Sequence, residues 1–140
     1  MELAFEGRPL PVHGDGSQRR SFTHVDDLVE GTVRALFSDR AVGELYNVGG
    51  AEEVTVLELA RRCWALARQD EPRIELQPYA SMGGNYEDVM RRIPDGTRAS
   101  EQLGFSAKVR LDDGLRRTWT WMLEHRLGRT PPCSGSSSPR

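Results

Sequence analysis

The chain has 140 residues, enough for one domain of ordinary size with its own core. Its composition, 37% hydrophobic and 29% charged, is typical of a globular protein and excludes a disordered one. A net charge of −2 excludes a polybasic surface for a nucleic-acid backbone or an anionic membrane, and no apolar run approaches the roughly 18 residues of a membrane span.

The cysteines and the first residues favour a reducing compartment. Only Cys63 and Cys133 are present, and no cysteine or histidine nearby gives metal-ligand spacing. A disulfide framework or a zinc site is therefore not indicated. Residues 1–6 are acidic and lack the basic start and apolar centre of a signal peptide. We expect a cytoplasmic protein without a bound metal.

Short elements are predicted before the first long helix. Residues 2–5 have the pattern of a last helical turn, and residues 10–12 form an extended piece in which proline favours a sheet edge. Residues 13–17 predict a turn whose glycines can take positive φ, and residues 20–25 predict a strand.

The next segment predicts a helix and then a short strand. Asp26 or Asp27 is expected to cap the helix, whose apolar spacing predicts a buried stripe of Leu28, Val29, Val33 and Leu36. Residues 45–48 are rich in strand formers and are followed by two glycines. Strand, helix and strand over residues 20–48 are compatible with one right-handed parallel crossover unit.

A capping box marks the start of the second long helix. Thr55 and Glu58 have the capping-box spacing, and Pro72 is expected to end the helix. Its apolar positions are Val56, Leu59, Ala60, Cys63, Trp64 and Ala67. Residues 73–76 then predict a strand, and residues 77–91 predict a loop.

The remaining residues predict two helices and a tail. Residues 97–103 predict a short helix closed by Gly104, and Asp112 is expected to cap a final helix. The inward side of that helix is formed by Leu115, Trp119, Met122 and Leu123. Residues 129–140 are rich in Ser, Gly and Pro and predict a disordered tail, so the folded portion is expected to be residues 1–128.

These elements predict a mixed α/β fold with few strands and about four helices. A single crossover unit makes a poor sheet by itself, because its strands lack neighbours. The sequence therefore predicts a missing structural neighbour.

Residues 12–31 contain a Gly-Asp-Gly turn, a glutamine, the step Arg20-Ser21-Phe22 and a Val-Asp-Asp helix start. This order resembles the carboxy-terminal halves of the extended short-chain dehydrogenase/reductase family. Its members convert nucleotide sugars and include UDP-glucose 4-epimerase, dTDP-glucose 4,6-dehydratase and UDP-glucuronate decarboxylase. The arginine–serine–phenylalanine step and residues 27–31 look most like the decarboxylase-type members.

Three further elements follow in the family's order. Residues 43–50 are similar to its tyr-asn-(ile/val)-gly strand, residues 55–60 to the helix after it, and residues 91–105 to its late arg-x-pro-asp segment with a leu-gly-aromatic helix end. The resemblance extends over roughly residues 3–125. It implies the carboxy-terminal, substrate-binding portion of an extended Rossmann-type short-chain dehydrogenase.

The resemblance also implies three substrate-binding residues. It places Arg20 and Arg92 near the diphosphate or the sugar of a UDP- or dTDP-linked nucleotide sugar, and Asn47 as a hydrogen-bond donor to the phosphate. Guanidinium groups suit this role because their planar donors bind phosphate oxygens bidentately and stay charged. Ligands of α/β sheets gather at the carboxyl ends of strands, which agrees with the position of Asn47.

Each of these residues has a structural alternative. Arg20 could be a solvated strand charge or an ion-pair partner of Asp26 or Asp27, and Asn47 could serve only to adopt left-handed backbone geometry. Arg91 is a rival of Arg92, which we prefer because it lies three residues before Asp95.

Structural roles are expected for several other polar and aromatic residues. Asp95 fits a cap of the helix that starts at residue 97 better than a substrate ligand. The histidines lack the matched carboxylate, serine or cysteine of a catalytic arrangement: His13, His24 and His125. The tryptophans are expected to serve in packing: Trp64, Trp119 and Trp121.

Two features of family catalysis are absent. Family members use a tyrosine base with a lysine four residues later. In this chain the residues four positions after Tyr46, Tyr79 and Tyr86 are Gly50, Gly83 and Met90, so no such pair exists. The family's glycine-rich cofactor turn is missing too, because Gly14-Asp15-Gly16 lacks its third glycine. NAD is thus implied for the intact family enzyme, and none is expected to bind this chain alone.

We therefore expect the substrate-binding part of an NAD-dependent nucleotide-sugar epimerase, dehydratase or decarboxylase without activity of its own. Truncation is the simplest explanation of the two absences. An apolar face is expected where the missing sheet packs, which favours a homodimer or a separate amino-terminal partner. The alternative is a non-catalytic nucleotide-sugar-binding or interaction module.

Overall fold

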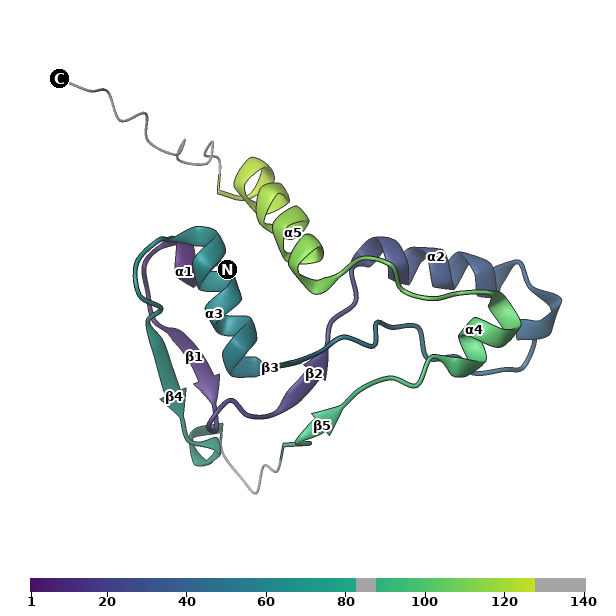
Figure 1. Cartoon of the computed structure of the whole chain (residues 1–140), viewed down its shortest axis with the longest axis horizontal. Helices are drawn as coiled ribbons and strands as arrows, with labels where there is room; N and C mark the ends of the chain where they lie inside the picture. The colour runs from purple at the N-terminus through teal and green to yellow at the C-terminus, as the bar shows by residue number, and fades with distance from the viewer. Residues whose placement is uncertain (83–87, 128–140) are drawn as a thin grey trace.

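The computed structural model describes residues 1–82 and 88–127. In this part of the chain it has a mixed α/β fold with five α-helices, two small sheets and two short 3₁₀ turns, Asp39–Ala41 and Tyr79–Met82 (Figure 1). The fold class predicted from the sequence is confirmed. The predicted tail, 129–140, lies outside the described residues.

The first sheet pairs β1 (Leu10–His13) with β4 (Ile74–Gln77) in parallel. Two helices, α1 (Glu2–Phe5) and α3 (Val56–Ala67), lie beside it (Figure 1). Their contact centres on Trp64, which is completely buried with Ala4 and Leu10. The indole N–H of Trp64 donates to the carbonyl and the carboxylate of Asp70, so its one polar group is satisfied inside the core.

The second sheet has the strand order β3–β2–β5 and lies in the middle of the molecule (Figure 1). Its strands are β2 (Arg19–Ser21), β3 (Glu53–Thr55) and β5 (Arg91–Arg92). β2 pairs antiparallel with β3 and parallel with β5. The sheet therefore joins three segments that are far apart in the sequence.

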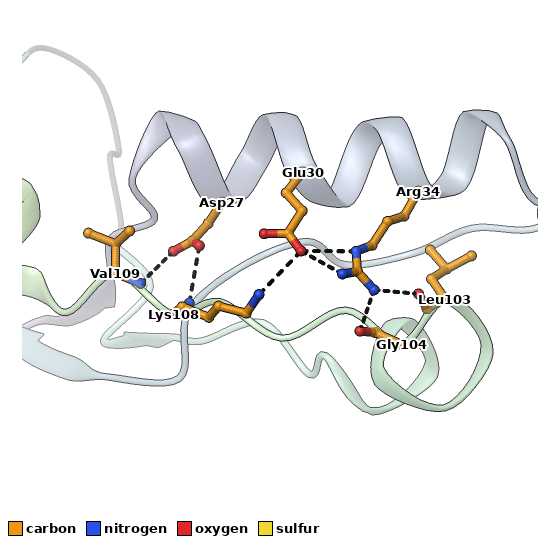
Figure 2. A network of polar contacts seen from close by, with 7 residues as sticks. All are labelled: Asp27, Glu30, Arg34, Leu103, Gly104, Lys108 and Val109. Atoms are coloured by element: carbon orange, nitrogen blue, oxygen red, sulfur yellow. Dashed lines mark hydrogen bonds and ion pairs between the residues drawn. The ribbon is translucent and has the colours of Figure 1, made fainter.

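Helices α2 (Val25–Leu36) and α4 (Thr97–Leu103) form a second core, in which Ala99, Leu103 and Phe105 are buried. α2 is held to the chain after α4 by polar contacts (Figure 2). Asp27, only 3% exposed, accepts hydrogen bonds from the backbone N–H groups of Lys108 and Val109. Arg34 binds Glu30 and donates to the carbonyls of Leu103 and Gly104.

Helix α5 (Leu111–His125) packs against α3 and α1 through its inward side. Trp119 is 9% exposed and Leu123 is 2% exposed, and the Trp119 ring lies 5.9 Å from that of Phe5. These positions agree with the predicted inward face. Trp121 differs, because it is 54% exposed and stacks on His125 at the surface.

The predicted crossover unit over residues 20–48 is wrong. The strand after the turn ends at Ser21, and residues 44–52 form no strand. β2 instead pairs with β3 and β5, since each of these strands offers it a hydrogen-bonding edge. Residues 46 and 48 contribute side chains to the core around α4 without joining a sheet.

The predicted cap of α2 is also wrong. His24 is the N-cap, and its Nδ1 atom accepts a hydrogen bond from the Asp26 backbone N–H at 3.2 Å. Asp26 lies in the first turn of α2 and pairs with Arg117, while Asp27 binds the chain after α4. The cap of α5 is Arg110, which makes no side-chain cap bond, so Asp112 is not the cap.

Two other predicted helix ends are borne out, those at Thr55 and Gly104, whereas Pro72 does not end its helix. Thr55 caps α3, because its hydroxyl accepts a hydrogen bond from the Glu58 N–H at 3.1 Å. Gly104 closes α4 in the left-handed conformation, with φ at 60°. α3 ends at Ala67, five residues before Pro72, and the strand predicted after it occupies Ile74–Gln77.

The apolar stripe of α2 faces solvent, contrary to the prediction. Val25, Leu28, Val29, Val33 and Leu36 are 47–74% exposed. The opposite side of the helix, with Asp27 and Gly31, packs against the chain. The helical period was predicted correctly, but the buried side was not, since burial of the stripe requires a surface that the described chain does not provide.

Candidate functional site

The register of β2 and β5 sets two predicted site residues side by side. Arg20 and Arg92 are direct partners in the parallel pair. Neighbouring strands lie about 4.8 Å apart, and side chains at paired positions point to the same face. Two guanidinium groups that are distant in the sequence therefore share one face of the central sheet.

Arg20 is fixed by three hydrogen bonds. It donates to the Asp88 carboxylate at 2.6 Å, to the Val89 carbonyl at 2.6 Å and to the Arg19 carbonyl at 2.8 Å. Its ion-pair partner is thus Asp88 and neither Asp26 nor Asp27. The side chain is 20% exposed, so the guanidinium is held in a defined place with two of its five N–H donors unused.

Asp88 receives a second donor from another segment. The hydroxyl of Tyr79 lies 3.2 Å from Asp88 Oδ2. Tyr79, Asp88 and Arg20 therefore form a chain of polar contacts at one end of β5. Sequence reasoning missed Tyr79 and Asp88, because nothing local to either residue indicates a contact with a strand near the start of the chain.

Arg92 is exposed and its guanidinium makes no hydrogen bond or ion pair within residues 1–82 and 88–127. Its neighbour Arg91 points to the other face, where it binds Glu53. The strand alternation thus separates the two rivals. Of the pair, Arg92 is the arginine that shares a face with Arg20.

Asn47 lies near this strand pair but in a different setting from that predicted. It sits in the segment without a strand, is exposed, and donates from its side-chain amide to the Asp95 carbonyl at 3.1 Å. Within the described residues no residue other than glycine has positive φ, so the left-handed alternative for Asn47 is excluded. Asp95 accepts from the Thr97 N–H at 2.9 Å, but the N-cap of α4 is Gly96, so Asp95 supports the helix start without being the predicted cap.

Three segments meet beside these residues. The Gly50 N–H donates to the Thr23 hydroxyl at 3.1 Å, and the Ser21 hydroxyl donates to the Gly50 carbonyl. Gly49 packs against Pro94 so closely that an added Cβ would lie 2.7 Å from Pro94 Cγ. The end of β2, the Gly49–Gly50 step and the chain after β5 are therefore in contact, and a glycine is required at position 49.

The opposite face of the sheet carries an ion cluster. Glu53 accepts from Arg19 Nε at 2.9 Å and from Arg91 Nε at 3.2 Å, and its other oxygen binds Arg91 Nη2. The hydrogen bonds from Arg91, and next those from Arg19, lower the pKa of the Glu53 carboxyl to about 2. Glu53 was not singled out from the sequence, because its partners depend on the strand order.

Two of the hollows in the structure are lined by residues that follow β2 or β5 in the chain. The larger, of about 590 Å³, lies between the start of α2 and α5 and is lined by residues that include His24, Arg117 and Trp121. The second, of about 420 Å³, is lined by Gly49, Pro94, Thr97 and neighbours. Neither lining includes Arg20, Asn47 or Arg92. The three predicted residues therefore do not line these two hollows.

The histidines have structural surroundings. His24 caps α2, and His125 stacks on Trp121. The buried Nδ1 atom of His13 has no hydrogen-bond partner within the described part of the chain. Among the described residues, no group of His, Cys, Asp and Glu side chains is arranged to hold a metal ion. The helices of residues 1–82 and 88–127 include none with the length and apolar character of a membrane span.

A model of the family described as GDP-mannose 4,6 dehydratase matches residues 2–118. The chain belongs to this family of extended short-chain dehydrogenases/reductases. It is 40% identical to dTDP-4-dehydro-6-deoxy-D-allose reductase of Streptomyces bikiniensis, over 89% of the chain and 36% of the relative. It is 41% identical to UDP-glucuronic acid decarboxylase 4 of Arabidopsis thaliana, over 80% of the chain and 24% of the relative.

Solved structures of the same family share the fold. The UDP-glucuronic acid 4-epimerase of Bacillus cereus, in complex with UDP-glucuronic acid and NAD, superposes with a TM-score of 0.76 at 27% identity, over 88% of this chain and 38% of the epimerase. The chain thus spans about a quarter to two fifths of the length of these relatives, and it corresponds to their carboxy-terminal part.

The glycine turn of this chain does not fit the cofactor of the family. It is followed by β2 and not by a helix, so no helix N-terminus faces it. The turn is also filled by side chains, because a Cβ at Gly14 would lie 2.7 Å from the Tyr79 ring and one at Gly16 would lie 2.8 Å from Leu57 Cβ. The glycine turn therefore has no room for the pyrophosphate of NAD, and no NAD is expected on this chain alone.

Proposed function

We propose that this chain is the substrate-binding part of an NAD-dependent nucleotide-sugar epimerase, dehydratase or decarboxylase, and that it does not turn over substrate alone. Residues 1–128 form that part, Arg20 and Arg92 bind the diphosphate of a UDP- or dTDP-linked sugar, and Asn47 donates a hydrogen bond to it. The in-register pairing of Arg20 with Arg92 carries this proposal.

The chemistry of the two arginines supports a diphosphate ligand. Arg92 has all five donors available among the described residues, and Arg20 has two. A diphosphate offers several anionic oxygens to two such groups at once, and charge-assisted bonds of this kind are stronger than neutral ones. Asn47 contributes less, because its amide already donates to Asp95, and it contacts the ligand through its remaining N–H.

Calorimetry with UDP and dTDP tests the binding site. Arg92→Ala should weaken affinity about 10- to 150-fold, the equivalent of a lost charge-assisted contact of about 1.5–3 kcal/mol. Arg20→Ala should weaken it too. Arg116→Ala is the matched control, since Arg116 forms only an exposed pair with Asp113. Equal affinity of the wild type and the Arg92 variant would refute the assigned ligand contact.

The absence of turnover has its own test. The chain is incubated with NAD and UDP-glucuronate, UDP-glucose or dTDP-glucose, and the products are separated and identified. We expect unchanged substrate, because the tyrosine–lysine pair and the cofactor turn are missing. Any conversion above the enzyme-free rate contradicts this part of the proposal.

The exposed stripe of α2 supports a second candidate function, that of an interaction module. Val25, Leu28 and Leu36 are exposed apolar side chains on one helix, and exposed apolar groups of this kind mark association sites on proteins. In this case the chain pairs with a second copy or with a separate amino-terminal partner that supplies the cofactor half. A cytoplasmic location stays a prediction in both cases.

A further inference from the structure

Glu53 connects all three strands of the central sheet on the face away from the proposed ligand. It lies on β3, beside Ser21 of β2, and its carboxylate crosses β2 to reach Arg91 on β5. Both oxygens bind Arg91, and one of them also binds Arg19. This bidentate contact is more specific in geometry than an ordinary surface ion pair.

The contact adds a side-chain restraint to a very short strand, whose position against β2 is also held by backbone and Arg20 bonds to Asp88, Val89 and Met90. β5 comprises only Arg91 and Arg92, and two arginines in succession offer the same side chain to either face. A slip of one residue would move every side chain of β5 to the opposite face. Together with the bonds of Arg20 to Asp88 and Val89, the bond to Glu53 holds Arg91 on the Glu53 face and leaves Arg92 on the face of Arg20.

We propose that Glu53 is a positioning residue, which binds Arg19 and Arg91 on one face of the sheet and thereby sets Arg92 beside Arg20 on the other. The inference rests on the proposed function, since it concerns the geometry of the same diphosphate site. Glu53 does not touch the ligand.

The charges of the sheet agree with this role. Paired strands bring four arginines together, and like charges directly opposite each other are destabilising. Glu53 offsets this repulsion on one face, and Asp88 binds Arg20 on the other. Among the described residues no carboxylate pairs with Arg92, which is the group left for an anionic ligand.

The test is a double-mutant cycle on affinity for UDP. Glu53→Gln keeps the size of the side chain and removes its charge, so affinity should fall about three- to thirtyfold, the usual scale of coupling within one charge network. In the Arg92→Ala background the same substitution should change affinity less than twofold. Glu44→Gln, which removes an exposed pair with Arg98, is the matched control and should bind like the wild type.

Thermal unfolding accompanies each titration, so that affinity is compared at equal folded fraction. If Glu53→Gln does not fold, Arg91→Lys replaces it, because lysine keeps the charge but cannot bind bidentately; it should weaken UDP binding although it lies on the far face. Wild-type affinity in the tested variant, or an equal loss with and without Arg92, would overturn the inference. Failure of the wild type to bind UDP would instead reject the proposed function.

Discussion

Asp27 is the clearest case of a residue whose role depends on distant partners. Its carboxylate is almost completely buried and accepts from the N–H groups of Lys108 at 3.1 Å and Val109 at 2.9 Å (Figure 2). These bonds join α2 to a segment about 80 residues later in the chain. Asp27 therefore stabilises the arrangement of α2 and the chain after α4.

Asp27→Asn should destabilise the fold by about 1–3 kcal/mol, because an amide can accept through only one atom and leaves a buried N–H unpaired. Urea unfolding monitored by circular dichroism measures the change. Asp26→Asn is the control, and it should cost less than about 1 kcal/mol, since Asp26 makes an exposed pair with Arg117. Equal effects of the two substitutions would argue against the proposed anchor.

Glu53 makes stability depend on pH in a defined window. Its pKa falls from 4.5 to about 2 in the folded chain, so the unfolded chain binds the proton more readily. The contribution of Glu53 is therefore fully present above pH 4.5 and is lost as the pH falls towards 2. Thermal unfolding between pH 7 and pH 2.5 should show the wild type losing its advantage over Glu53→Gln across that window. A constant difference at every pH would contradict the lowered pKa.

At the scale of elements, α2 packs through its polar side because its glycine permits a close approach. An added Cβ at Gly31 would overlap Cγ1 of Val48 and lie 3.2 Å from the Phe105 ring. Alanine is normally preferred to glycine inside a helix by about 1 kcal/mol. Here the overlap opposes that preference.

We predict that Gly31→Ala destabilises the chain by about 1–2 kcal/mol, since overpacking of a core costs more than the helix preference returns. Chemical denaturation measures it. Adding Val48→Ala removes the nearest atom, so the double variant should lose less than the sum of the two single variants. Simple additivity would mean that the two positions do not collide.

The elements were predictable where the deciding interaction is local. The capping box at Thr55 and the closing Gly104 are set by neighbours within four residues, and the structure has both. The strand at 45–48 and the cap by Asp26 or Asp27 were wrong, because pairing and capping depended on competing partners. β5 has only two residues and could not be seen as a strand before its register with β2 was known.

The residues of the candidate site also differ in how far they could be predicted from the sequence. Family motifs pointed to Arg20, Asn47 and Arg92, and their ligand contacts remain predictions. The preference for Arg92 over Arg91 could be argued only weakly from the distance to Asp95, whereas the sheet separates the two onto opposite faces. Glu53 and Asp88 were missed because each meets its arginine across at least 34 residues of sequence.

At the scale of the whole molecule, the described chain forms two small cores with an uncovered apolar surface on α2. We predict concentration-dependent self-association of the purified chain through that surface, measured by sedimentation velocity. Leu28→Lys with Leu36→Lys should shift the chain to monomers, because each introduces a charge into the stripe. Ala65→Lys on the exposed side of α3 is the control. Association that persists in the double variant would place the contact elsewhere.

The three bonds that hold Arg20 have a consequence for the ordering cost of a ligand. A free arginine carries about 2 kcal/mol of rotamer entropy, which is lost when the side chain becomes rigid. For Arg20 that loss accompanies folding, because Asp88 and two carbonyls already immobilise it. When an anion binds to this face, only the side chain of Arg92 then loses rotamer entropy. Arg20 is preorganised, so its electrostatic attraction to the anion comes at little further entropic cost.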